Sequence, residues 1–171
     1  MATYGEVETV LAALHDMDAE RQTSAFRARL KHFKRLGLPL GLTPGKGKRI
    51  DYGSDEILQL AFALELTQVG VDPAFITEAV RFYWSRIKFS FDYADALTRK
   101  EEENGDVYFV IPVAMMSKPW SKDNGMVITT VPASRLIEFL GRGVTRCVLI
   151  NVSDFIRRLL RCYNDIVKGD L

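Results

Sequence analysis

Nine basic side chains lie between residues 21 and 50 of this 171-residue chain, with no acidic residue among them. They are Arg21, Arg27, Arg29, Lys31, Lys34, Arg35, Lys46, Lys48 and Arg49. The chain has 23 basic and 22 acidic residues in total, so 14 basic residues remain elsewhere to balance all 22 acidic ones. A cationic segment of this kind attracts a polyanion and releases its counterions on binding. We therefore expect these side chains to bind nucleic acid, although a charge cluster alone also fits a solvated basic helix.

Enzyme chemistry would need other residues in other arrangements. Ser134 has no histidine neighbour and no nucleophile-elbow sequence around it. The two histidines, His15 and His32, and the two cysteines, Cys147 and Cys162, form neither a metal-ligand pattern nor a disulfide framework. Nothing in the sequence assembles an acid, a base and an oxyanion donor. We expect no enzymatic activity, no metal and no cofactor.

Composition places the chain among globular proteins. Apolar residues make up 47% of the chain, which is enough to bury a core. No apolar segment approaches the roughly 18 residues of a membrane span, and the first ten residues have no apolar signal core. The sparse cysteines suit a reducing compartment. We expect a cytoplasmic protein of one large or two small domains that does not enter a membrane.

The basic residues need helices to position them. Apolar spacing predicts a short helix over about Gly5 to Met17 and a second one over Ala19 to Leu36, with Asp18 as its N-cap and Gly37 as its stop. In the second helix, basic residues recur at three- and four-residue spacing beside an apolar stripe. Two short helices, the second of them basic, suit a helix-turn-helix.

A hairpin is expected next. The segments Leu40–Leu42 and Arg49–Tyr52 can pair as short strands around the turn-forming Pro44-Gly45 and Gly47. The Lys-Gly-Lys tip has the character of a wing that lies along a phosphate backbone. A nucleotide-binding loop is the alternative for these glycines, but the spacing and context of such loops are missing.

Two further helices follow this hairpin. Ser54 is the expected N-cap of a helix that ends at Gly70. Asp72-Pro73 then begins the next helix, with the aspartate as cap and the proline in the first position.

The order of these pieces resembles the MerR-type transcription regulators. The stretch LKHFKRLGL at residues 30–38 resembles the end of that family's first helix-turn-helix, and Arg49 with Tyr52 resembles the Arg-x-Tyr that ends its wing, one residue further apart. The helices that begin near Ser54 and Gly70 look like the family's second helix pair. The resemblance covers about residues 6–80; His32 departs from it by standing where a tyrosine is common.

The resemblance implies a winged helix-turn-helix on double-stranded DNA. Arg27, Lys31 and Arg29 would then read base edges in the major groove. Lys46, Lys48 and Arg49 of the wing would contact phosphates. RNA polymerase or a small effector would be further partners.

A long helix from Pro73 to about Lys100 is expected to join two copies. It has an apolar seam at heptad-like spacing, interrupted by Ser90. The resemblance favours a homodimer through this helix; packing on the chain's own domain is the alternative. The dimerisation residues are predicted to be Ile76, Val80, Tyr83, Ile87, Ala94 and Leu97.

The remainder is predicted to be a small α/β unit. Its expected elements are strands over 107–116, 126–131 and 146–152 and helices over 133–140 and 153–167, with Ser153 as the cap of the last helix and the first strand in the centre. The fold class is therefore mainly α with a small α+β C-terminal part. The expected division is 1–72 for DNA binding, 73–100 for the dimerisation helix and 105–171 for a regulatory or oligomerisation domain.

Two other functions compete with a sequence-specific transcription regulator. A prophage- or plasmid-type excisionase, which bends DNA as an accessory protein, uses a similar winged module. A third interpretation, from another class, is an α/β ligand-sensing or enzymatic domain whose basic helix binds an acidic protein partner.

Overall fold

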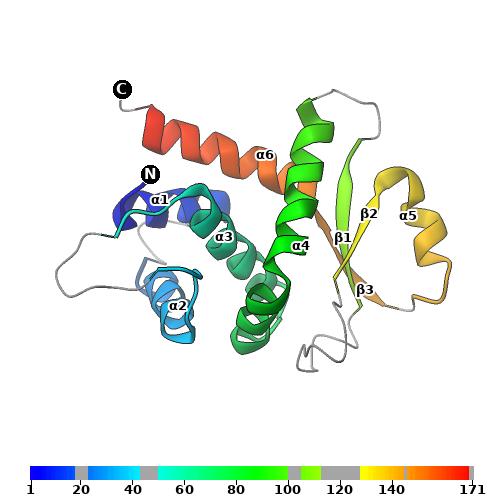
Figure 1. Ribbon diagram of the computed structural model, residues 1–171, viewed down its shortest axis with the longest axis horizontal. Coiled ribbons are helices and arrows are strands. Elements are labelled where there is room, and N and C mark those ends of the chain that lie inside the picture. Colours follow the sequence, from blue (N-terminus) through cyan, green and yellow to red (C-terminus); the bar gives the residue numbers. More distant parts are fainter. Residues whose placement is uncertain (18–22, 43–49, 100–104, 113–127, 145, 170–171) are drawn as a thin grey trace. The chain divides into compact units, whose positions relative to one another are not determined.

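The computed structural model describes residues 1–17, 23–42, 50–99, 105–112, 128–144 and 146–169, and these residues are mainly helical (Figure 1). Six α-helices, a short π-helix and a three-stranded antiparallel sheet lie within them. The chain forms two compact units: Met1–Gln68 with Arg158–Leu171, and Val69–Arg157. None of the helices in the described ranges combines the length and apolar character that a bilayer-spanning segment requires.

Three helices build most of the first unit: α1 (Tyr4–Leu14), α2 (Thr23–Leu36) and α3 (Ser54–Gln68). A capping box starts α1, where the Thr3 hydroxyl accepts from the Glu6 backbone N–H and the Glu6 carboxylate accepts from that of Thr3. The N-terminal residues are anchored by an antiparallel bridge between Ala2 and Tyr52.

Helix α3 lies at the centre of this unit. Every residue from Ile57 to Leu64 is buried, including the polar Gln59. The Gln59 Oε1 atom accepts a hydrogen bond from the Leu40 backbone N–H at 2.7 Å, so its buried amide is partly satisfied. This bond fixes the segment after α2 against α3.

The second unit contains α4 (Pro73–Arg99), β1 (Val107–Pro112), β2 (Thr129–Pro132), α5 (Ala133–Leu140), β3 (Cys147–Asn151) and the first half of α6 (Val152–Tyr163). The strand order is β2-β1-β3, and both pairings are antiparallel. Helix α4 packs on the sheet through the Phe91 ring, which meets Phe109 edge-on at 5.4 Å and Phe155 at 5.7 Å. The hydroxyls of Ser90 and Thr130 lie 2.6 Å apart. Ser90, the polar residue that interrupts the apolar seam of α4, therefore has a hydrogen-bond partner.

Several predicted elements are confirmed. The second helix ends at Leu36, and Gly37 follows it with φ 95°. Asp72 caps α4 by accepting from the Ala74 backbone N–H at 2.8 Å, and Pro73 is the first helical residue. The strand β1 is central, as its apolar faces predicted. The Asp18 cap lies outside the described residues.

The predicted pairing of Leu40–Leu42 with Arg49–Tyr52 is wrong for the described residues. Tyr52 pairs with Ala2 instead, with hydrogen bonds of 2.8 and 2.9 Å in both directions. Leu40 cannot join a strand ladder because its N–H is bonded to Gln59. Gly41 has φ 84°, which is turn geometry rather than strand geometry.

Other corrections concern caps and strand direction. Ser54 is the first helical residue of α3 and not its N-cap. The Glu56 carboxylate accepts a hydrogen bond from the backbone N–H of Gly53. Ser153 is fully buried, and its hydroxyl accepts from the Val107 N–H instead of capping α6. The α6 cap comes from Asn151, whose Oδ1 accepts from the Asp154 N–H. The antiparallel sheet makes this part α+β rather than α/β.

Candidate nucleic-acid interface

One flank of α2 presents four of the predicted DNA-binding residues together, which we call the basic row: Arg27, Lys31, Lys34 and Arg35. All four are exposed. The core-facing side of the helix buries Phe26, Leu30 and Phe33. At about 100° per residue, the row spans roughly a quarter of the helix circumference. Burial of the three apolar side chains therefore fixes which way the row faces.

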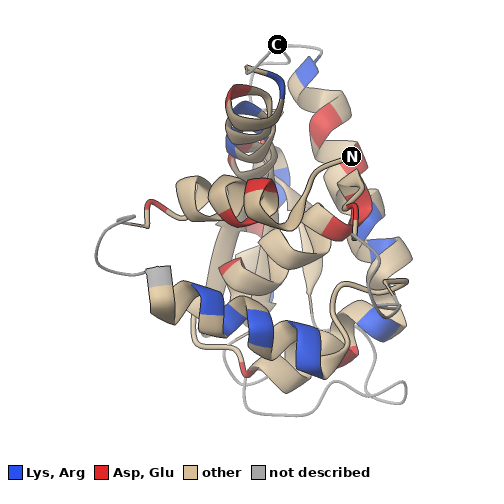
Figure 2. Ribbon diagram, turned by 90° about the vertical axis from the view of Figure 1, so that its left-hand side faces the viewer, with Lys and Arg blue, Asp and Glu red and all other residues tan. Residues whose placement is uncertain are grey.

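The electrostatic setting of the row is almost wholly positive. The α2 sequence has no acidic residue, and Figure 2 shows its Lys and Arg ribbon segments without acidic ones between them. Among the described residues, no carboxylate forms an ion pair with Lys31, Lys34 or Arg35. Lys34 and Arg35 also occupy the last turn, where the helix dipole favours positive charge.

Arg27 differs from the rest of the row because it has a partner. Its Nε atom lies 2.5 Å from Oε1 of Glu8 on α1, and the Glu8 side chain is only 12% exposed. An acidic group therefore borders the N-terminal end of the row. No sequence spacing indicated this pair, since the partners lie on separate helices.

Arg29 does not belong to the row. It lies about 160–200° around α2 from Arg27 and Lys31. The pKa of His15 is lowered mainly by burial, and the Arg29 charge is the smallest of its causes. Of the other predicted DNA-binding residues, Arg21, Lys46, Lys48 and Arg49 lie outside the described residues.

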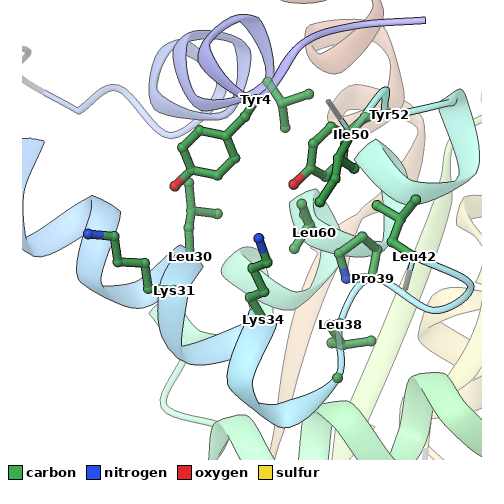
Figure 3. A pocket seen from close by; sticks show the side chains of 12 residues that line it. Tyr4, Leu30, Lys31, Lys34, Leu38, Pro39, Leu42, Ile50, Tyr52 and Leu60 are labelled. Atoms are coloured by element: carbon green, nitrogen blue, oxygen red, sulfur yellow. The ribbon is translucent and has the colours of Figure 1, made fainter. Parts of the chain in front are cut away.

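A cavity of about 310 Å³ opens beside the row (Figure 3). Its lining comes from α1, α2, α3 and the segments on either side of residues 43–49. The residues are Tyr4, Val7, Leu30, Lys31, Lys34, Gly37, Leu38, Pro39, Leu42, Ile50, Tyr52 and Leu60. The lining side chains include two lysines and two tyrosines but no carboxylate.

The two tyrosines form one edge of this cavity. Their ring centroids lie 6.4 Å apart. Burial raises the pKa of both hydroxyls; at Tyr4 the nearby Glu8 adds to the rise and Arg27 opposes it, and at Tyr52 the Tyr4 hydroxyl adds to it. Both groups are therefore neutral at physiological pH and can donate hydrogen bonds. Nothing in the sequence brought Tyr4 and Tyr52 together; their proximity follows from the Ala2–Tyr52 bridge.

A second polar cluster in the first unit surrounds His15. The ring is 3% exposed, and its Nδ1 atom lies 2.6 Å from Nε2 of Gln68 and 3.5 Å from Oε2 of Glu65. Burial, followed by the Arg158 charge, lowers the His15 pKa to about 4. The ring is thus neutral at pH 7, and its contact with Glu65 is not an ion pair there. Burial also raises the pKa of Glu65.

The predicted dimerisation seam is largely covered by the chain itself. Ile76, Val80, Ile87 and Ala94 are completely buried, whereas Tyr83 and Leu97 are half-buried. This favours the alternative in which the seam packs in the chain's own interior. A homodimer stays a prediction, but the seam is not available for it without unpacking the chain.

A different face of α4 carries exposed aromatic side chains, which we call the aromatic stripe: Phe82, Phe89 and Tyr93. Their exposed fractions are 42%, 69% and 38%. The spacing of seven and four residues places them on one side of the helix, about 130° from the buried seam. The sequence indicates that some aromatic side chains of this helix lie away from the seam, because there are more of them than one seam can bury. It does not identify which of them are exposed to solvent.

The described residues were also compared with the requirements of a metal site. They contain no group of three or more His, Cys, Asp or Glu side chains that could hold a metal ion.

Comparison of the chain with family models, with curated proteins and with solved structures found no match. Any function must therefore be argued from the chain's own residues.

Proposed function

We propose that this protein is a sequence-specific, double-stranded DNA-binding transcription regulator that uses a MerR-like winged helix-turn-helix. Helix α2 is the recognition helix in this proposal. Lys46, Lys48 and Arg49, from the segment that the sequence predicts to be the tip of a wing, would contact phosphates. The second unit, Val69–Arg157, contributes dimerisation or regulation.

The observation that carries the proposal is the basic row on α2. Three of its four cations have no described carboxylate partner, and an apolar stripe holds the other side of the helix in the core. A helix fixed in this way presents positive charge at a constant orientation, which is what docking against a phosphate backbone or a groove requires. A merely solvated basic helix would be expected to have acidic neighbours at i,i+4 spacing, such as those beside the cations of α4.

A dimer is the natural form of such a regulator, because one helix-turn-helix covers only one half-site. We infer that the aromatic stripe on α4 is the surface that pairs. An antiparallel pair of α4 helices centred on Phe89 would bring the aromatic stripes of the two copies face to face, so that the same surface patch meets itself across a two-fold axis.

Binding-site selection with the whole chain tests the proposal. A pool of random duplexes should converge on one motif, in two copies related by a two-fold axis. Convergence with a fixed sharp bend at a recombination-type site would favour the excisionase interpretation. Recovery of no motif, together with binding to an acidic protein but not to DNA, would overturn DNA binding altogether.

A further inference from the structure

The cavity beside the basic row has the features of a ligand site. Its interior surface is mainly apolar, with Leu30 from α2, Leu60 from α3 and Leu38 from the segment that follows α2. Figure 3 shows the Lys34 ammonium and the Tyr52 hydroxyl directed toward the hollow. A pocket with an apolar lining and a few convergent polar groups is the usual form of a small-molecule site.

The Tyr52 hydroxyl is available to a ligand. The residue as a whole is only 3% exposed, and it lines the cavity. No hydrogen bond of its hydroxyl to another described residue is present, so the hydroxyl can donate to a ligand atom in the cavity without first breaking a bond inside the protein.

We propose that this cavity binds a small amphipathic carboxylate, with its carboxylate between Lys34 and Tyr52 and its apolar body against Leu30, Leu38 and Leu60. The polar side chains of the lining are ammonium and phenol groups, which donate to an anion, and no lining carboxylate repels one. A water molecule occupies about 30 Å³ in the liquid, so the cavity has room for about ten heavy atoms.

The same binding event has a consequence that rests on the proposed function. Lys34 belongs both to the cavity and to the basic row. A carboxylate bound at Lys34 neutralises a charge that DNA would use. Ligand and DNA should therefore exclude each other, with equal and reciprocal effects on the two affinities.

Calorimetric titration of the whole chain with octanoate, without DNA, tests the site. We expect saturable binding of one octanoate per chain, with 1-octanol binding at least several-fold more weakly because it lacks the charge. Lys34→Met should weaken octanoate binding roughly tenfold, since it removes a charge-assisted hydrogen bond but keeps the aliphatic stem. Arg35→Met is the matched control, because Arg35 is a neighbouring cation that does not line the cavity.

Tyr52→Phe separates the hydroxyl from the ring and should weaken octanoate binding while leaving the cavity apolar. Circular dichroism of each variant establishes that it is folded. Absence of saturable binding up to about 10 mM, the limit of weak but specific affinity, would overturn the proposal. Equal affinities for octanoate and octanol, or an unchanged affinity in folded Lys34→Met, would also overturn it.

Competition with a duplex then separates the two proposals. Octanoate should lower DNA affinity, while the same concentration of sodium acetate controls for ionic strength. Octanoate binding without any effect on DNA affinity would overturn mutual exclusion but not the site. If the chain binds octanoate and no duplex, the proposed function fails while the carboxylate site stands.

Discussion

Arg27 of the basic row is paired with Glu8 of α1, at 2.5 Å between Nε and Oε1. Arg27 is predicted to read base edges at the start of the proposed recognition helix, and it is held by a carboxylate whose side chain is only 12% exposed. If the protein binds DNA as we propose, the DNA would compete with Glu8 for Arg27, and the pair would lower the affinity.

Glu8→Gln should raise DNA affinity about two- to fivefold. The substitution removes a negative charge from the binding face and releases Arg27, and partly exposed pairs contribute about 0.2–1 kcal/mol. Fluorescence anisotropy with a labelled duplex measures the change. Glu78→Gln is the matched control, because Glu78 pairs with Arg81 on α4 and its loss changes net charge equally. Equal gains in both variants would show a general charge effect instead.

The basic row also predicts a difference between the two flanks of α2. Lys31→Met or Arg35→Met should weaken binding to every duplex and flatten the plot of log affinity against log salt by about one unit. Arg29→Met, on the other flank, should leave the salt dependence nearly unchanged. If Arg29→Met flattens the slope as much as Lys31→Met does, the row is not the face that meets the phosphates.

Much of the helical framework could be predicted because its signals are local. Gly37, the Asp72 cap and the central strand β1 follow from turn chemistry, capping and apolar patterning within a few residues. The prediction of a strand at Leu40–Leu42 was wrong because a residue distant in the sequence determines the local structure. The side-chain amide oxygen of the buried Gln59 accepts the hydrogen bond of the Leu40 backbone N–H. No local pattern distinguishes a strand N–H from one that is bonded to a distant side chain.

The site shows the same division. The charge and apolar spacing of α2 were enough to predict the basic row, since helical period alone places those residues. The pairing of Arg27 with Glu8 and the meeting of Tyr4 with Tyr52 depend on how helices and termini pack, which one sequence does not encode locally. The α4 seam was assigned to a dimer because apolar periodicity marks a buried face without saying what buries it.

Phe89→Asp should convert a dimer to a monomer that binds one half-site weakly. Phe89 is the most exposed aromatic of the stripe, so a charge there should leave the fold intact while disrupting a paired surface. Sedimentation velocity measures the oligomeric state. Ile137→Asp is the control, because Ile137 is an 82% exposed apolar residue on α5.

Val80→Glu, by contrast, should unfold the protein, since it buries an unpaired charge at a fully covered position. A folded, monomeric Val80→Glu beside a dimeric Phe89→Asp would reverse these assignments.

The buried His15 predicts how stability depends on pH. Its pKa is about 4 in the folded chain, against 6.5 for a solvent-exposed histidine such as that of the unfolded chain. Between these values the unfolded chain binds a proton that the folded chain does not, so the free energy of unfolding rises with pH. The contribution is fully present above pH 6.5 and is lost as the pH falls to 4. At about 1.36 kcal/mol per unit of pKa, it amounts to at most about 3 kcal/mol.

Urea denaturation of the wild type and of His15→Gln between pH 4 and 8 isolates this contribution. The variant should lose the part of the slope between pH 6.5 and 4, whatever its absolute stability. Glu65 opposes the effect, because its raised pKa means that the folded chain takes up a proton there more readily as the pH falls. Glu65→Gln should therefore keep the pH dependence of stability that comes from His15 and remove the opposing pH dependence that comes from Glu65. Arg158→Met should weaken the His15 effect, since the Arg158 charge is the second cause of the lowered pKa, after burial. Parallel pH profiles for the wild type and His15→Gln would show that the ring is protonated in the folded chain as readily as in the unfolded one.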